Sequence, residues 1–189
     1  MLTDNMEYKS AKPLIKKHKI SEIHSIIKIK HDLLPSFMNL DKKDQQLLTL
    51  LQNNARTAVS ELATAVSLSD TPCLRRIKKL EASKVICGYH TAINPRSLGL
   101  NVLVYAFVRL SQNSVSAANI FEEQVEKLNH VLECSVISGS YDYLLKIIAT
   151  DLESYESFVK HKLGSINCIA NIESTVVLKQ TFSKKQLPL

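Results

Sequence analysis

The chain has 189 residues, of which 45% are hydrophobic and 22% charged, a composition typical of globular proteins rather than disordered ones. Its length suits one medium domain or two small ones. No apolar run reaches the roughly 18 residues that a membrane helix needs, and the N-terminus lacks the layout of a signal peptide. We therefore expect a cytoplasmic protein with no membrane partner.

The net charge of +6 is distributed unevenly along the sequence. Residues 1–39 carry seven lysines against four acidic residues, and residues 40–97 carry nine Lys and Arg against five. Residues 98–189 carry eight against nine. The basic surplus lies in the N-terminal half, which favours contact between that half and a polyanion.

The four cysteines are too far apart for a Cys-x-x-Cys metal or redox motif. We expect them to be reduced, buried small hydrophobes, and we expect no metal site. They are Cys73, Cys87, Cys134 and Cys168.

Residues 1–38 form a basic N-terminal extension with two interpretations. Ile20, Ile23 and Ile27 share one helical face between lysines, which would suit a short amphipathic arm that adds non-specific DNA affinity. The preferred interpretation is a disordered extension or a misassigned start codon, because Met38 stands directly before the first recognisable domain.

A three-helix domain is predicted over residues 39–86. Asp41 is expected to cap a helix at about residues 42–53, with Asp44 three positions on. A shorter helix is expected at residues 58–66. The expected inward positions of the two helices are Leu47, Leu48, Leu51, Leu62, Ala63 and Val66.

The third helix, at about residues 70–83, is the basic one. Cys73, Ile77 and Leu80 recur on one face, and Ser69 is expected to cap the first turn through its hydroxyl. Two helices across a short turn, the second basic, form a helix-turn-helix whose second helix reads DNA. The alternative is an ordinary surface helix with solvated charges. The basic residues outside the buried face are Arg75, Arg76, Lys78 and Lys79.

The segment that follows is predicted to be a wing-like strand and hinge. Residues 85–93 alternate loosely between apolar and polar, and Asn94-Pro95 ends the pattern. We assign residues 87–97 to this hinge strand or linker, which makes the N-terminal domain a winged helix-turn-helix.

Residues 98–180 are predicted to form a ferredoxin-like domain. Strands at residues 98–110, 131–138, 142–149 and 169–179 alternate with a helix at 117–128, capped by Ser116, and a helix capped by Asp151. This β-α-β-β-α-β order places two helices on one face of a four-stranded antiparallel sheet. The chain is therefore α+β, with a short tail at residues 181–189.

The first of these strands is apolar on both faces. Because helices cover only one face of such a sheet, a second apolar face predicts a partner, most simply another copy of the same sheet. Residues of one face are Val102, Val104, Ala106 and Val108, and those of the other are Leu103, Tyr105 and Phe107.

Several short motifs, in this order, resemble the Lrp/AsnC family of transcription regulators, and the Leu-Pro-Leu ending resembles its Lrp branch. The motifs are Leu40-Asp41-x-x-Asp44, Leu51-Gln52 with Ala55-Arg56, Leu62-Ala63, Leu68-Ser69-x-Thr71-Pro72-Cys73, Arg76-Ile77-Lys78-Lys79-Leu80-Glu81, Asn94-Pro95 with Leu98-Gly99, and Ser138-Gly139-x-x-Asp142-Tyr143-Leu144.

The resemblance implies a nucleoid-associated regulator that binds double-stranded DNA as a homodimer, or as a tetramer or octamer, with its recognition helices paired. Arg76 has an equally weighted alternative role, a structural bridge to a nearby acid. The expected DNA contacts are Ser69, Thr71, Pro72, Arg75, Arg76 and Lys79.

The resemblance also implies an amino-acid effector, and no other cofactor, bound between C-terminal domains. Backbone N–H groups of a glycine-containing turn can hold a carboxylate, and Asp142 can accept an ammonium group. The alternative is that Gly139 and Asp142 simply form the hairpin turn. The expected effector residues are Gly139, Ser140, Tyr141, Asp142, Tyr143, Thr175 and Val176.

Three turns depart from the family pattern. The family usually has glycine at the positions of Ser67 and Lys84, which flank the recognition helix, and Pro-Gly at Asn167-Cys168. If Ser67 and Lys84 adopt left-handed conformations, each costs on the order of 1 kcal/mol or more.

Two alternative functions remain. Some relatives of this family are siroheme decarboxylases that use histidines, but the six histidines here are scattered and lack a catalytic or metal-ligand pattern. We therefore expect no enzyme activity. The other alternative is an architectural protein that wraps DNA without a ligand, which differs from a regulator only in whether the pocket is used.

Overall fold

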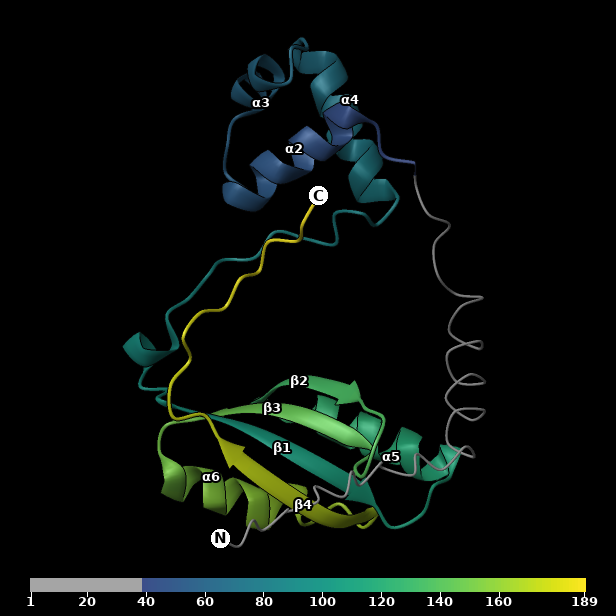
Figure 1. The fold of residues 1–189 in the computed structure, drawn as a ribbon, viewed down its shortest axis with the longest axis vertical. Coiled ribbons are helices and arrows are strands. Elements are labelled where there is room, and N and C mark those ends of the chain that lie inside the picture. Colours follow the sequence, from purple (N-terminus) through teal and green to yellow (C-terminus); the bar gives the residue numbers. More distant parts are fainter. Residues whose placement is uncertain (1–38) are drawn as a thin grey trace, which may run out of the picture. The chain divides into compact units, whose positions relative to one another are not determined.

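The computed structural model describes residues 39–189. The amphipathic arm and the alternative disordered extension expected at residues 1–38 lie outside the described residues. From Leu40 onward the chain forms an N-terminal helical domain and a C-terminal α+β domain, labelled in Figure 1.

Three helices, α2 (Lys42–Asn53), α3 (Val59–Ala65) and α4 (Asp70–Ala82), form the N-terminal domain. Each lies within one residue of its predicted position at both ends. Leu47, Leu62 and Cys73 bring one side chain from each helix into a shared core that solvent does not reach. The apolar spacing of the sequence therefore specifies which face of each helix is buried.

The two predicted N-caps of this domain have different outcomes. The Asp41 carboxylate accepts the Asp44 N–H at 2.8 Å, and the Asp44 carboxylate accepts the Asp41 N–H at 3.4 Å, so the capping box is confirmed. Ser69 does precede α4, but its hydroxyl makes no cap hydrogen bond, so that prediction is wrong. The third position of α4 is Pro72, which has no N–H to donate.

Ser67 and Lys84, which stand where the family usually has glycine, both have a left-handed conformation, with φ of 53° and 59°. Each of these residues follows the last turn of a helix, which is closed by the same kind of backbone hydrogen bond. After α3, Leu68 N–H donates to the Ala63 carbonyl at 2.8 Å, and after α4, Val85 N–H donates to the Leu80 carbonyl at 3.0 Å. These bonds satisfy the last helical carbonyls in a geometry that glycine adopts more easily.

Replacing Lys84 with glycine is therefore expected to raise the free energy of unfolding by about 1 kcal/mol. The matched control is Lys78→Gly in the middle of α4, where the same substitution is expected to cost roughly 0.7 kcal/mol because the backbone there is right-handed. Urea denaturation followed by circular dichroism measures both. Destabilisation by Lys84→Gly would contradict the assigned strain.

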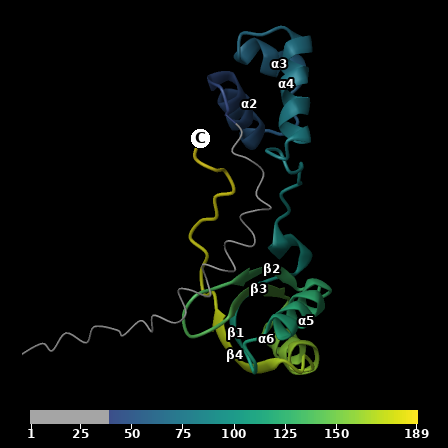
Figure 2. The ribbon, with the colours of Figure 1, turned by 90° about the vertical axis from the view of Figure 1, so that its right-hand side faces the viewer.

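The C-terminal domain is a four-stranded antiparallel sheet with strand order β2-β3-β1-β4. Figure 2 shows both helices on one side of this sheet. The predicted β-α-β-β-α-β order is confirmed, and the α6 helix continues through a π-helical turn, Val159–Leu163. The elements are β1 (Val102–Leu110), α5 (Val115–Glu126), β2 (Val131–Val136), β3 (Tyr143–Ala149), α6 (Leu152–Phe158) and β4 (Ile169–Val176).

The two faces of β1 differ in what covers them. Val104, Ala106 and Val108 are completely buried in the core that includes residues of α5 and α6. Tyr105 and Phe107 alternate with them and are only half-buried. The two-sided apolar pattern is therefore confirmed, and the expected partner for the open face stays a prediction.

Three local predictions are wrong. Residues 85–93 do not form a strand. A strand needs a neighbouring strand to pair with, and none of the described segments pairs with these residues. Helix α5 begins at Val115, because Ser114 and not Ser116 accepts the Ala117 N–H, at 3.2 Å. Cys87 and Cys134 are exposed rather than buried, although both are free thiols as expected.

Candidate DNA interface and effector site

The outer face of α4 presents a row of unpaired cationic side chains. Arg75, Lys78 and Lys79 are exposed, and none forms an ion pair with any described residue. Ser69 and Thr71, at the start of the helix, are also exposed. Because the opposite face of α4 is anchored in the core, these groups point to solvent and can neutralise phosphates.

Arg76, unlike the other cationic residues of α4, forms ion pairs with residues that the structure describes. Its guanidinium Nη1 lies 2.6 Å from Asp41 Oδ2 and 2.7 Å from Asp44 Oδ1. Asp44 is 6% exposed and is the buried charged residue of the described chain. The Arg76 guanidinium therefore holds α4 against the start of α2, which agrees with the alternative role of Arg76 as a structural bridge to a nearby acid.

The pKa values of this network follow from its hydrogen bonds. The pKa of Asp41 is lowered, first by the Asp44 N–H and then by Arg76. The pKa of Arg76 is raised by its hydrogen bonds to Asp44 and Asp41. Each shift favours the charged form, so the ion pair persists at neutral pH.

The turn between β2 and β3 is tied closely to β1. Asp142 Oδ2 accepts the Leu110 N–H at 2.9 Å, and the Asp142 N–H donates to the Val108 carbonyl at 2.9 Å. Gly139 has a φ of 127°, a conformation that other residues rarely adopt. Asp142 therefore has a structural role in the turn, through one of its two carboxylate oxygens.

An aromatic and charged cluster surrounds Tyr141 in this turn. The Arg109 guanidinium lies 5.2 Å from the Tyr141 ring centroid, and Arg109 Nε donates to the Ser140 carbonyl at 2.9 Å. The Phe107 ring lies 5.6 Å from Tyr141, whose hydroxyl donates to Glu173. That hydrogen bond raises the pKa of Tyr141, so the hydroxyl stays protonated at neutral pH.

Sequence reasoning missed Phe107, Arg109 and Glu173 as members of this cluster. Phe107 and Glu173 are directly opposite in the β1–β4 register, and Arg109 is two positions along β1 on the same face. The only sequence signal was the alternation of β1, which places Arg109 on the same face as Phe107.

The other expected effector residues are divided between the two faces of the sheet. Tyr143 is 3% exposed, and its hydroxyl donates to Glu122 at 2.9 Å; burial raises its pKa. Val176 is opposite Val104 and shares its helix-covered face, whereas Thr175 is opposite Tyr105 on the open face. The structure therefore groups Ser140 and Tyr141 with the open face and separates Tyr143 and Val176 from it.

Neither a metal site nor a membrane helix is found among residues 39–189. No three His, Cys, Asp or Glu side chains in that range are grouped so that they could hold a metal ion. None of the helices there is long and apolar enough to span a bilayer.

Two family models match the chain. Residues 40–81 match the AsnC-type helix-turn-helix domain, and residues 103–187 match the Lrp/AsnC ligand binding domain. Among similar proteins, the chain is 34% identical to a proline dehydrogenase transcriptional activator of Rhizobium radiobacter, over 75% of this chain and 90% of that protein. It is 32% identical to the leucine-responsive regulatory protein of Escherichia coli K12, over 79% and 91%.

Solved structures give the same result. A transcriptional regulator from Neisseria meningitidis, in complex with L-Met, has a TM-score of 0.76 and 34% identity, and the match covers 79% of this chain and 97% of that one. An AsnC family regulator from Agrobacterium tumefaciens has a TM-score of 0.75 and 32% identity, with coverage of 79% and 97%. These relatives are transcription regulators and not enzymes. The chain therefore belongs to the Lrp/AsnC family of DNA-binding transcription regulators and combines its helix-turn-helix with its ligand-binding domain.

Proposed function

We propose that this regulator binds a two-fold-related double-stranded DNA site through the α4 helices of two chains, and that an amino acid bound by its C-terminal domains changes that binding. The exposed cationic face of α4, whose Arg75, Lys78 and Lys79 form no ion pair in the described part of the chain, is the observation that carries the proposal. A regulator of this kind acts on the nucleoid, in the cytoplasm.

The proposed DNA contacts are of two kinds. Ser69, Thr71 and Pro72 begin α4, and the N-terminal turn of a recognition helix reaches base edges. Arg75 and Lys79 are proposed to meet phosphates or guanines, because their charges are exposed and form no ion pair with residues 39–189. Arg76 is proposed to act indirectly, since its ion pairs with Asp41 and Asp44 fix the position of α4.

The proposed homodimer is supported by the open face of the sheet. Leu103, Tyr105 and Phe107 are apolar, lie on that face and are only half-buried in a single chain. Packing this face against a second copy would remove their apolar surface from water, which is the usual driving force for association. A two-fold dimer would also present two α4 helices, and tetramers or octamers are further assemblies of it.

The proposed effector is an amino acid because the residues around Tyr141 offer both charges that a zwitterion needs. Arg109 can meet a carboxylate together with the backbone of the Gly139 turn, and the second oxygen of Asp142 can accept an ammonium group. The L-Met complex of the Neisseria relative supports the same ligand class. The side chain that the pocket prefers depends on residues that a second chain would contribute.

Binding to duplexes selected from a random pool tests the DNA role. Fluorescence anisotropy at several salt concentrations should give a steep decrease in affinity, since each phosphate contact releases counterions. In a dimer, Arg75→Ala or Lys79→Ala removes two contacts and should flatten the log–log slope by about 2 while lowering affinity roughly tenfold at low salt.

The matched control is Lys127→Ala, an exposed lysine at the end of α5 that is expected to leave the slope unchanged. An affinity that barely responds to salt, or slopes that change equally in all three variants, would contradict the assignment of α4 as the DNA-binding surface.

A further inference from the structure

The last residues of the chain contact helix α2 through hydrogen bonds. The Leu187 N–H donates to Gln52 Oε1 at 2.6 Å, and Gln52 Nε2 donates back to the Leu187 carbonyl at 3.3 Å. Next to this pair, Gln186 Nε2 donates to Asn53 Oδ1 at 2.7 Å. One side-chain amide thus binds both backbone groups of one residue, as a neighbouring strand would.

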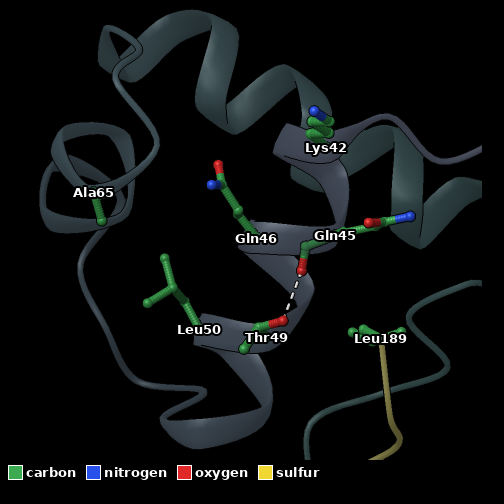
Figure 3. A pocket seen from close by; sticks show the side chains of 7 residues that line it. All are labelled: Lys42, Gln45, Gln46, Thr49, Leu50, Ala65 and Leu189. Atoms are coloured by element: carbon green, nitrogen blue, oxygen red, sulfur yellow. Dashed lines mark hydrogen bonds between the residues drawn. The ribbon is translucent and has the colours of Figure 1, made fainter.

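The final residue helps to line a pocket on the same helix. This pocket has a volume of about 520 Å³, and Leu189 forms part of its lining. Figure 3 shows Leu189 beside the part of α2 that carries Gln45 and Thr49. The remaining lining residues are Lys42, Gln46, Leu50 and Ala65.

We propose that α2 carries a docking site for the last four residues of its own chain, Gln186 to Leu189, and that docking links the DNA-binding domain to the C-terminal domain. This goes beyond DNA and effector binding, which use neither Gln52 nor the Leu-Pro-Leu ending. The structure brings these two sequence motifs together, 135 positions apart.

Chain connectivity argues for the chain's own tail as the occupant. The tail follows β4, which ends at Val176, so residues 177–185 are a short tether to the docking residues. A tether of this kind gives an effective concentration on the order of millimolar, which a free competitor rarely reaches. Pro188 further restricts the undocked tail and so lowers the entropy lost on docking.

The strength of these contacts indicates a reversible attachment. Exposed hydrogen bonds stabilise a contact only weakly, and the loss of conformational entropy on ordering the tail opposes docking. Leu187 and Leu189 remain 71% and 57% exposed, so apolar burial adds little. Docking is therefore reversible, with the docked state favoured by the tether, and release would free the DNA-binding domain to reorient.

A peptide-binding experiment tests the docking site. A fluorescein-labelled peptide with the sequence of residues 181–189 is titrated with the chain lacking residues 186–189, and saturable anisotropy is expected. Gln52→Ala should weaken binding about tenfold, because it removes two hydrogen bonds. The matched control is Gln124→Ala on α5, which should have no effect.

The intact chain should bind the same peptide at least tenfold more weakly than the truncated one, because its own tail occupies the site. Equal binding by the two chains, or none by the truncated chain, would overturn the proposal. Mixed dimers of full-length Gln52→Ala and truncated chains identify the source of the tail. Peptide binding by the truncated partner supports docking within one chain, and loss of it would overturn that assignment in favour of the second copy.

Discussion

Arg76→Met is expected to lower the free energy of unfolding of the N-terminal domain by about 2 kcal/mol, even though Arg76 belongs to a basic, solvent-facing helix. The substitution keeps the alkyl packing and removes the guanidinium that lies within 2.7 Å of both Asp41 and Asp44. The Asp44 side chain is only 8% exposed, so its carboxylate loses its main compensating charge. Such a change in a fully buried pair costs about 3–5 kcal/mol, and the partial exposure of Arg76 reduces it.

Arg75→Met is the matched control, because Arg75 is exposed and has no ion pair among residues 39–189. Its effect on stability should stay within about 0.5 kcal/mol, while its effect on DNA affinity should be large. Urea denaturation followed by far-UV circular dichroism separates the two substitutions. Equal destabilisation by both would show that the Asp41–Arg76–Asp44 network contributes nothing particular.

Acid should weaken the same network. The folded pKa of Asp41 is below its ordinary value of 3.8, so its stabilising contribution is complete above the ordinary value and is lost as pH falls through the lower one. Arg76→Met should reduce this acid sensitivity without abolishing it, because the Asp44 N–H is the larger cause of the shift.

Asp142→Asn is expected to remove most of the response to the amino-acid effector without unfolding the turn. The asparagine carbonyl can still accept the Leu110 N–H that Asp142 Oδ2 accepts at 2.9 Å, but the negative charge for an ammonium group is gone. A ligand at 100 times its Kd stabilises the folded state by about 2.7 kcal/mol, which a thermal-shift screen of the twenty amino acids detects.

Loss of a charge-assisted hydrogen bond weakens binding by about 1.5–3 kcal/mol, so most of that thermal shift should disappear in Asp142→Asn. Glu156→Gln is the control, since Glu156 lies on α6 and pairs with Lys160 in the π-helical turn that follows this helix. A full thermal response in Asp142→Asn would mean that Asp142 serves only the turn.

Apolar spacing alone determined much of this fold. The buried positions of α2, α3 and α4 and the two-sided alternation of β1 depend on which face of one element is apolar, and that information is local. The left-handed conformation of Ser67 and Lys84 agrees with the glycine that the family usually has at both positions, because many helices end with a residue in that conformation.

The parts that sequence could not supply depend on long-range contacts. Arg76 meets Asp41 and Asp44 from 35 and 32 positions away, and Tyr141 meets Glu173 from 32 positions away. These pairs follow from helix packing and strand register, which apolar spacing does not fix. The prediction of a strand at residues 85–93 was wrong for a related reason. The sequence pattern there suits a strand, but the described chain supplies no neighbouring strand for it.

The most direct test of the account is DNA affinity measured with and without the amino acid that stabilises the protein. Coupling between an effector site and a DNA site changes affinity by about 5-fold to 150-fold in typical regulators. We predict a change of at least 5-fold in the intact protein and a much smaller one in Asp142→Asn. An amino acid that stabilises the protein yet leaves its DNA affinity unchanged, or the absence of any stabilising amino acid, would contradict an effector-controlled regulator and favour ligand-independent DNA binding.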